Sequence, residues 1–195
     1  MSIPSELRTP RLLLRPWRPE DAEQLAPILV RDNDHLAPWI PAAVATPASG
    51  PQLAERLSAF AADFAAARSW RFALLDVASN ELLGEIDLFP RNATGRVPLA
   101  EADRAEVGYW LRSDRTGNGF VTEAVQAVID AATCVGRFSH IEIRCDVRNA
   151  RSAAVPARLG FRRVDDETWG RESSVGGGEL SIWILPLGET PASDV

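Results

Sequence analysis

The stretch from 106 to 124 constrains the fold most strongly, because a strand pattern runs there into a glycine turn and then into a helix pattern. Apolar residues at every second position from 107 to 111 give the period of a strand with one buried face. Gly117 and Gly119 follow in a polar turn, where glycine lets the backbone adopt positive φ and approach a ligand closely. The predicted helix after the turn carries one apolar stripe, formed by Phe120, Val121, Ala124, Val125, Val128, Ile129 and Ala132.

A glycine turn that opens a helix is typical of an anion site. It exposes backbone N–H groups at the positive end of the helix dipole, so the turn is predicted to bind a phosphate-bearing ligand. The turn is neither a Walker loop, because no G-K-[ST] follows, nor a dinucleotide fingerprint, because the G-x-G-x-x-G spacing is absent. A plain strand-to-helix turn, with glycines used only for positive φ, is the alternative.

A second motif, N-x-x-S-x-x-V-x-x-R-L-G-F, occupies residues 149–161 after an alternating apolar strand pattern. Five further segments accompany it: L-x-T-x-R-L-x-L-R at 7–15, H-L-A-P-W-I-P at 35–41, A-E-V-G-Y-W-L at 105–111, T-G-N-G-F-V at 116–121 and T-E-A at 122–124. In this order and spacing the set resembles the GNAT superfamily of acyl-CoA-dependent N-acetyltransferases, specifically its RimJ/RimL-like branch. The resemblance spans residues 7–187.

The resemblance implies an α/β (α+β) GNAT fold, with a mixed, mostly antiparallel sheet, a splayed central strand pair and helices on both faces. Composition agrees with a single domain over residues 1–187, since 195 residues of which 46% are hydrophobic can bury one core. The tail at 188–195 is predicted to be disordered. The other expected elements are a strand at Leu12–Leu14, helices from Pro19 and Pro51, a long connection at 32–50, a hairpin of strands at 70–77 and 82–88, a polar loop at 90–104 and a last strand at 179–186.

Composition and charge narrow the functional class. No 18-residue apolar run or signal-peptide core occurs, which favours a cytoplasmic protein that does not bind membranes. Cys134 and Cys145 are expected to be free thiols, and two histidines without a Cys/His cluster predict no metal site. The net charge of −6 argues against a nucleic-acid partner and is compatible with a cationic substrate. We expect a monomer or a homodimer.

The resemblance implies that acetyl-CoA is the cosubstrate and that main-chain N–H groups of the glycine loop hold its pyrophosphate. The family loop usually begins with Gln or Arg and ends with Gly or Ala, whereas this chain has Thr116 and Val121 there. Asn149 matches the residue that hydrogen-bonds the pantetheine arm, and Arg158 is placed to reach the 3′-phosphate. The predicted cofactor contacts are Trp110, Leu111, Arg112, Thr116, Gly117, Asn118, Gly119, Phe120, Val121, Thr122, Asn149, Ser152 and Arg158.

Acyl transfer to an amine needs a base for the amine and an acid for the leaving thiolate. Glu106 matches the glutamate that the family uses as a general base, and a solvated carboxylate at a strand start is the alternative. The tyrosine that many members use as the acid is replaced by Pro156, which as a proline requires a helix that begins near 151–153 or is kinked. In the RimL-like branch the acid is the serine at Ser152, which is equally suited to cap the helix. Glu172 lies near the place of an assisting glutamate.

The acceptor side is predicted from aromatic and acidic residues. Trp39 in the long connection and Trp169 in a Gly/Ser-rich loop are expected to line an acceptor pocket with Glu85, and a hydrophobic plug is the alternative for both tryptophans. Such a pocket suits a protein N-terminus, a polyamine or an aminoglycoside, and the branch favours transfer to the N-terminal amine of a protein of the ribosomal type. The alternatives are a small-molecule amine acetyltransferase acting on a polyamine, an aminoglycoside or another antibiotic, and a non-catalytic acyl-CoA-binding module.

Overall fold

A computed structural model describes residues 2–164 and 177–188. Its strands are β1 (Leu7–Arg8), β2 (Leu12–Pro16), β3 (Trp70–Asp76), β4 (Leu82–Asn92), β5 (Gly95–Arg96), β6 (Arg104–Leu111), β7 (His140–Asp146), β8 (Arg162–Val164) and β9 (Leu180–Pro186). Its α-helices are α1 (Ala22–Arg31), α2 (Asn33–Leu36), α3 (Ala42–Ala45), α4 (Gly50–Ala65), α5 (Phe120–Val135) and α6 (Ala150–Arg158). Short 3-10 turns occupy Pro19–Asp21, Leu99–Glu101 and Ser113–Arg115.

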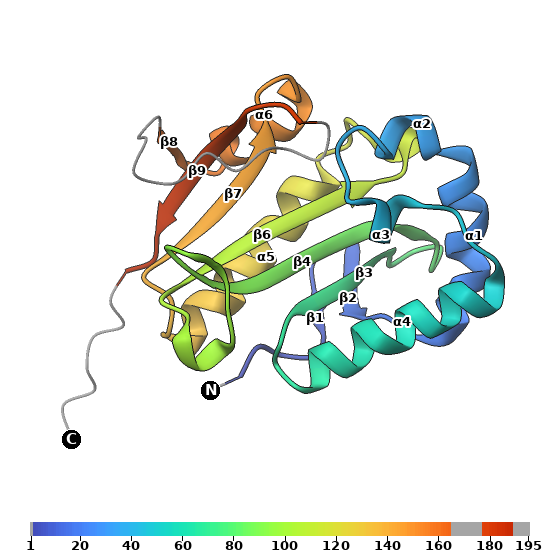
Figure 1. The fold of residues 1–195 in the computed structure, drawn as a ribbon, viewed down its shortest axis with the longest axis horizontal. Helices are drawn as coiled ribbons and strands as arrows, with labels where there is room; N and C mark the ends of the chain where they lie inside the picture. Colours follow the sequence, from blue (N-terminus) through green and yellow to red (C-terminus); the bar gives the residue numbers. More distant parts are fainter. Residues whose placement is uncertain (1, 165–176, 189–195) are drawn as a thin grey trace.

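The described strands form one sheet in the order β1-β2-β3-β4-β6-β7-β9-β8, with β5 added to β4 (Figure 1). All neighbours are antiparallel except β6 and β7, which are parallel. The predicted mixed, mostly antiparallel sheet is therefore confirmed. Within residues 2–164 and 177–188, no helix combines the length and the apolar composition needed to cross a membrane.

The sheet opens between β6 and β7. Their parallel ladder joins only Ala105–Val107 to Ile141–Ile143, whereas β4 pairs with β6 as far as Leu111. Figure 1 shows the two strands diverging beyond the ladder, with α6 following β7. In the described part of the chain, residues 108–111 thus have no strand partner on the β7 side, as the splayed pair predicts.

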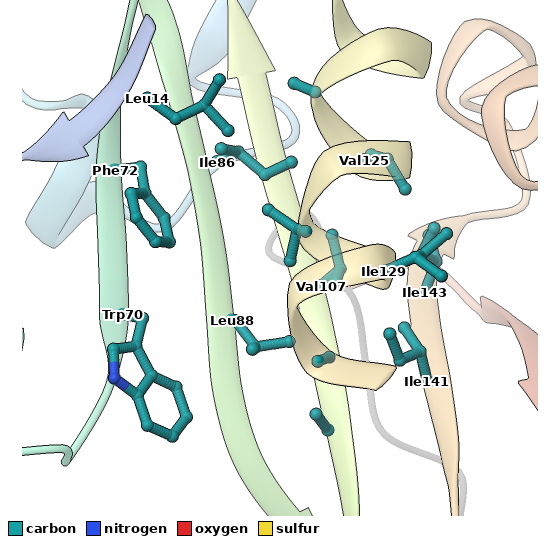
Figure 2. Packing of buried hydrophobic residues seen from close by; sticks show 14 of the residues in the cluster. Leu14, Trp70, Phe72, Ile86, Leu88, Val107, Val125, Ile129, Ile141 and Ile143 are labelled. Carbon is teal, nitrogen blue, oxygen red and sulfur yellow. The ribbon is translucent and has the colours of Figure 1, made fainter. Parts of the chain in front are cut away.

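Helices cover the two faces of the sheet with separate apolar clusters. On one face, Val125 and Ile129 of α5 pack over Val107 and the β7 residue Ile143 (Figure 2). On the other face, the cluster includes Leu25 of α1, Leu53 of α4 and Trp110 of β6. The two clusters place β6 in the middle of the molecule.

The prediction of one buried face for the central strand is wrong, because both of its faces are covered. Val107 belongs to the α5 cluster and Trp110 to the α1 and α4 cluster, and Glu106 is only 8% exposed. The alternate positions Glu106, Gly108 and Trp110 form the second face, where Trp110 packs in the α1 and α4 cluster and Glu106 lies between Arg91 and Arg96. Polar side chains on β6 are therefore buried and require hydrogen-bond or ionic partners.

Two expected connections contain regular structure. Residues 32–50 include the short helices α2 and α3, and the loop expected at 90–104 holds the end of β4, β5 and a 3-10 turn. The Pro90 carbonyl accepts from the Val97 N–H, on the β5 side of β4. Because the N–H and C=O of a strand residue point to the same side, the N–H that proline lacks would also face away from β6. β4 therefore continues through Pro90 without losing a hydrogen bond to β6. Apart from Gly188, the tail at 188–195 lies outside the described residues.

Candidate functional site

The glycine loop after β6 opens α5 as predicted. Gly117 and Gly119 have φ of +82° and +78°, the left-handed region that glycine adopts without strain. Gly119 is the N-cap of α5 and supplies no side-chain cap, so the first N–H groups of the helix stay available to a ligand. Around Gly117 a Cβ would meet nothing within 4 Å, which means that the loop backbone borders open space. These features make the loop an anion site.

Arg11 lies beside this loop and was missed by the sequence analysis. Its Nη1 donates to the Asn118 carbonyl at 2.9 Å, and its guanidinium lies 4.6 Å from the ring centroid of Phe120. Glu123 in the first turn of α5 accepts from the same guanidinium at 2.6 Å. The L-x-T-x-R segment at 7–15 held this arginine, but its position against α5 depends on a contact 107 residues away.

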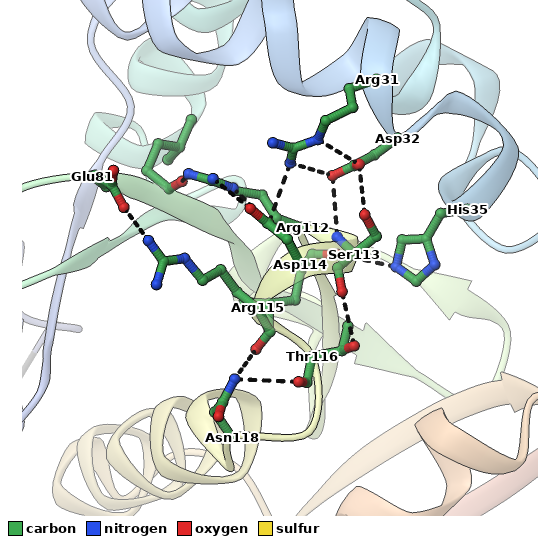
Figure 3. A network of polar contacts seen from close by, with 12 residues as sticks. Arg31, Asp32, His35, Glu81, Arg112, Ser113, Asp114, Arg115, Thr116 and Asn118 are labelled. Atoms are coloured by element: carbon green, nitrogen blue, oxygen red, sulfur yellow. Dashed lines mark hydrogen bonds and ion pairs between the residues drawn. The ribbon is translucent and has the colours of Figure 1, made fainter.

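A polar network joins the loop to the end of α1 and to α2 (Figure 3). Asp32, only 2% exposed, accepts from the backbone N–H of Ser113 at 3.1 Å and from its Oγ at 2.7 Å. The hydrogen bond from Arg31, helped by Ser113, lowers the pKa of Asp32 to about 2. His35 Nε2 also contacts the Leu111 carbonyl at 3.2 Å. The loop is therefore held in place without a ligand.

Several predicted cofactor residues are used inside this network. Arg112 donates to Asp114 at 2.8 Å and to the Leu82 carbonyl at 3.1 Å, and Thr116 Oγ1 donates to the Ser113 carbonyl at 2.9 Å. Asn118 Nδ2 donates back to two loop carbonyls. These side chains shape the loop, so its main-chain N–H groups remain as the phosphate donors. The predicted cofactor roles of Arg112, Thr116 and Asn118 stay predictions.

The second motif forms the β7–α6 corner opposite this loop. Asn149 caps α6, because its Oδ1 accepts from the Ser152 N–H at 3.0 Å. The helix begins at Ala150, so Ser152 is its third residue, and the alternative that Ser152 is the cap is wrong. The Ser152 Oγ instead donates to the Tyr109 hydroxyl at 3.2 Å. Arg158 is exposed in the last turn of α6.

Pro156 lies inside α6, which begins at Ala150, just before the start near 151–153 that the proline predicted as the alternative to a kink. A residue with an N–H at 156 would donate to the carbonyl of Ser152, and proline cannot. The Tyr109 hydroxyl donates to that carbonyl at 2.9 Å instead. Burial raises the pKa of Tyr109, so its hydroxyl keeps its proton. A strand residue thus replaces the hydrogen bond that the proline removes.

Tyr109→Phe is expected to lower the free energy of unfolding by about 1–3 kcal/mol, because a half-buried carbonyl loses its donor. In a Pro156→Ala background the same change should cost less, since the new alanine has an N–H that can donate to the carbonyl of Ser152. Chemical denaturation of the four proteins in this double-mutant cycle measures the difference. An equal cost in both backgrounds would show that Tyr109 does not compensate for the proline.

A cavity of about 220 Å³ lies at the splay, between these two motifs. Three groups of residues line it: Trp39, Ile40, Pro41 and Val44 from the segment around α3; Arg71, Glu85, Asp87, Phe89 and Arg96 from β3 to β5; and Glu106, Val107, Gly108, Tyr109, Trp110, Ile143, Arg144, Cys145, Asp146, Asn149, Ser152 and Leu180 from the sheet centre and α6. The predicted residues Trp39, Glu85, Glu106, Trp110, Asn149 and Ser152 are thus brought together. Trp169 and Glu172 lie outside the described residues.

Glu106 enters this cavity between two arginines. Its Oε2 accepts from Arg91 and its Oε1 from Arg96, each at 2.5 Å. Arg91 is itself 3% exposed, so the pair is interior. Both oxygens of Glu106 therefore accept from guanidinium groups, and Arg91 also pairs with Glu142 at 3.5 Å. The general-base role of Glu106 stays a prediction.

A family model of the GNAT acetyltransferase domain matches residues 11–162, which include both motifs. The chain belongs to the GNAT acetyltransferase family. It is 27% identical over 154 residues to the candidate ribosomal N-acetyltransferase YdaF of Bacillus subtilis, which covers 77% of each chain. It is 39% identical over 57 residues to the ribosomal-protein-serine acetyltransferase of Escherichia coli, 29% of this chain and 32% of that protein. The resemblance to the RimJ/RimL-like branch is confirmed.

The fold agrees with this assignment. The structure of Mycobacterium smegmatis RimJ in complex with CoA-disulfide superimposes with a TM-score of 0.74 at 27% identity, covering 96% of this GNAT chain and 88% of RimJ. The chain is an acetyl-CoA-dependent N-acetyltransferase. The residues present suit the coenzyme, because the uncapped α5 N-terminus borders open space at Gly117 and, among the described residues, 108–111 of β6 have no partner on the β7 side. Bound there, acetyl-CoA supplies the thioester.

Proposed function

We propose that this acetyltransferase modifies the N-terminal amine of a protein. The observation that carries the proposal is the cavity at the splay, which the α3 segment and the acidic face of β4 line from two sides. Glu85 and Asp87 offer carboxylates to a cationic amine, while the apolar Ile40, Pro41 and Val44 suit the side chain or backbone that follows it. The names of YdaF and the Escherichia coli relative favour a ribosomal protein as the acceptor.

Catalysis on this proposal uses groups from both faces of the sheet. The unpaired edge of β6 at 108–111 holds the pantetheine arm and a backbone N–H there polarises the thioester carbonyl. Ser152 lines the cavity from the α6 side and protonates the leaving thiolate, and the Tyr109 hydroxyl positions its Oγ. Asn149, which fixes the first turn of α6, places Ser152 at the cavity.

The acceptor class is tested by release of free CoA thiol with a panel of amines. Peptides that begin with serine or alanine are expected to give turnover, while spermidine and an aminoglycoside of equal concentration should not. Mass spectrometry of the peptide identifies acetylation at the α-amine, and a peptide with a blocked N-terminus and one lysine is the matched control. Turnover with the small amines alone would overturn the protein acceptor.

Trp39→Ala is expected to raise the KM for the peptide and to leave acetyl-CoA affinity unchanged. Trp39 is half-buried and lines the cavity, whereas its neighbours Ile40 and Val44 pack against the α1 and α4 cluster. Steady-state kinetics with both substrates and a melting temperature measure the effects. Leu36→Ala is the structural control, since Leu36 is buried in that cluster and its truncation should lower stability more than Trp39→Ala. An unchanged peptide KM with reduced stability would make Trp39 a hydrophobic plug.

A further inference from the structure

We infer that Asp87 is the general base of acetyl transfer and accepts the proton that the acceptor amine loses. The inference concerns the transfer reaction itself and holds for a peptide or for any other amine. Three features of the described residues support it. One oxygen of Asp87 has no hydrogen-bond donor, a glycine faces Asp87 across the sheet, and both oxygens of Glu85 and of Glu106 already accept hydrogen bonds.

Asp87 presents one carboxylate oxygen that nothing satisfies. Its Oδ2 accepts from Arg71 Nη1 at 3.3 Å, while its Oδ1 is buried and has no hydrogen-bond partner among the described residues. Asp87 is 8% exposed and lines the cavity. A buried carboxylate oxygen without a donor is costly, which favours proton uptake by Asp87.

The position opposite Asp87 on β6 is a glycine. Gly108 pairs with Asp87 in the β4–β6 ladder, and a Cβ built on Gly108 would lie 3.6 Å from Asp87 Oδ2. Any side chain at 108 would extend from that point over the carboxylate. Gly108 also lies just past the last β6–β7 pair, so Asp87 adjoins the unpaired edge where the thioester is held.

The neighbouring Glu85 lacks both features. Its Oε2 accepts from Trp17 Nε1 at 2.6 Å and its Oε1 from Arg71 at 3.1 Å, so both oxygens have donors. Its partner across the ladder is Trp110, a large buried side chain, in the place that Gly108 takes beside Asp87. Both oxygens of Glu85 are therefore occupied, and burial raises the pKa of this carboxyl as well.

Burial and the adjacent Glu85 favour proton uptake by Asp87, while Arg71 and Arg96 oppose it. Burial, and then the adjacent Glu85, raise the pKa of Asp87 well above its ordinary range. The charged groups that face it are Glu85 on β4, Arg71 on β3, Arg96 on β5 and Glu106 on β6. A carboxylate with a raised pKa is a stronger base than an ordinary aspartate.

The reaction balances with these groups. The amine nitrogen forms a bond to the thioester carbonyl carbon, and its proton passes to the Asp87 carboxylate. The carbon–sulfur bond breaks, and the thiolate takes the Ser152 hydroxyl proton. Ser152 regains a proton from water and Asp87 releases one to water, so the products are the acetylated amine and CoA thiol.

Asp87→Asn is expected to lower kcat by roughly 10²–10⁴-fold, the usual range for a general base, with little change in acetyl-CoA affinity or melting temperature. In the wild-type enzyme kcat should rise with pH through a midpoint well above the ordinary aspartate range, because only ionised Asp87 accepts a proton. The acidic limb should disappear in Asp87→Asn and persist, shifted, in Asp87→Glu. Carbon-13 NMR of labelled aspartate should show the Asp87 carboxyl titrating at the wild-type midpoint without any acceptor.

Glu106→Gln is the matched comparison. It should lower the melting temperature, because two guanidinium groups lose a charged partner, but keep the acidic limb at the same pH. Turnover of Asp87→Asn within tenfold of wild type, or loss of the limb in Glu106→Gln alone, would overturn the role of Asp87. These kinetics are measured with whichever amine the enzyme acetylates. If no peptide is acetylated, the proposal of a protein acceptor fails, but the role of Asp87 can still be tested with another amine.

Discussion

Gly119→Asp is expected to abolish acetyl-CoA binding. The new carboxylate would lie at the N-cap of α5, where the pyrophosphate meets the first helical N–H groups. Two unit charges of the same sign at about 4 Å repel by about 4 kcal/mol at an effective dielectric constant of 20, which corresponds to roughly a 10³-fold loss of affinity. Isothermal titration calorimetry with acetyl-CoA measures this loss.

Gly119→Asn is the matched control, because asparagine has the shape of aspartate and tolerates the left-handed φ of +78°. It should retain most of the affinity, so that the difference between the two variants isolates the charge. A Cβ at 119 would lie 3.6 Å from Arg11 Nη2, and this guanidinium offsets part of the repulsion. Wild-type affinity in Gly119→Asp would contradict a pyrophosphate at this loop.

Gly84→Ala is expected to be the most destabilising single-methyl addition in the sheet. A Cβ at this position would lie 2.1 Å from the Trp110 carbonyl oxygen and 3.0 Å from Leu111 Cα, both backbone atoms of β6. Overpacking of this kind costs about 1–3 kcal/mol or more, which lowers the melting temperature of a domain of this size by roughly 2–12 °C. Thermal denaturation followed by circular dichroism checks the shift.

Gly188→Ala is the control for this prediction, because a Cβ there meets nothing within 4 Å just after β9. It should leave the melting temperature unchanged or raise it slightly. Gly84→Ala should also weaken acetyl-CoA binding, since the displaced backbone at Trp110 and Leu111 belongs to the edge that holds pantetheine. Equal melting temperatures for the two variants would show that the β4 and β6 backbones move apart without loss of stability.

The local elements were predictable because their signals lie close together in the sequence. The Gly117 and Gly119 turn and the apolar stripe of α5 lie within 19 residues, and the structure places them as expected. The strands of the β3–β4 hairpin were found in the same way. Local periodicity and turn chemistry fix such elements.

Interior polar positions could not be predicted in this way. The residues Arg91 and Arg96, which surround Glu106, come from a segment that was interpreted as a polar loop. The Tyr109 hydroxyl that lets Pro156 stay inside α6 comes from a strand 43 residues before Ser152. Such partners are set by tertiary packing, which overrides local patterns. The surroundings of Asp87 could not be predicted for the same reason.

The hydrogen bonds from Ser113 to Asp32 described above bear on how turnover will depend on pH. Its pKa in the folded protein, about 2, lies below that of an unfolded aspartate, so it stabilises the fold above that range and ceases to do so only as the solution approaches pH 2. Asp32 therefore stays ionised over any pH at which the enzyme is assayed, and its hydrogen bonds to Ser113 persist. A change of turnover with pH thus does not come from loss of the Asp32 charge beneath the coenzyme loop.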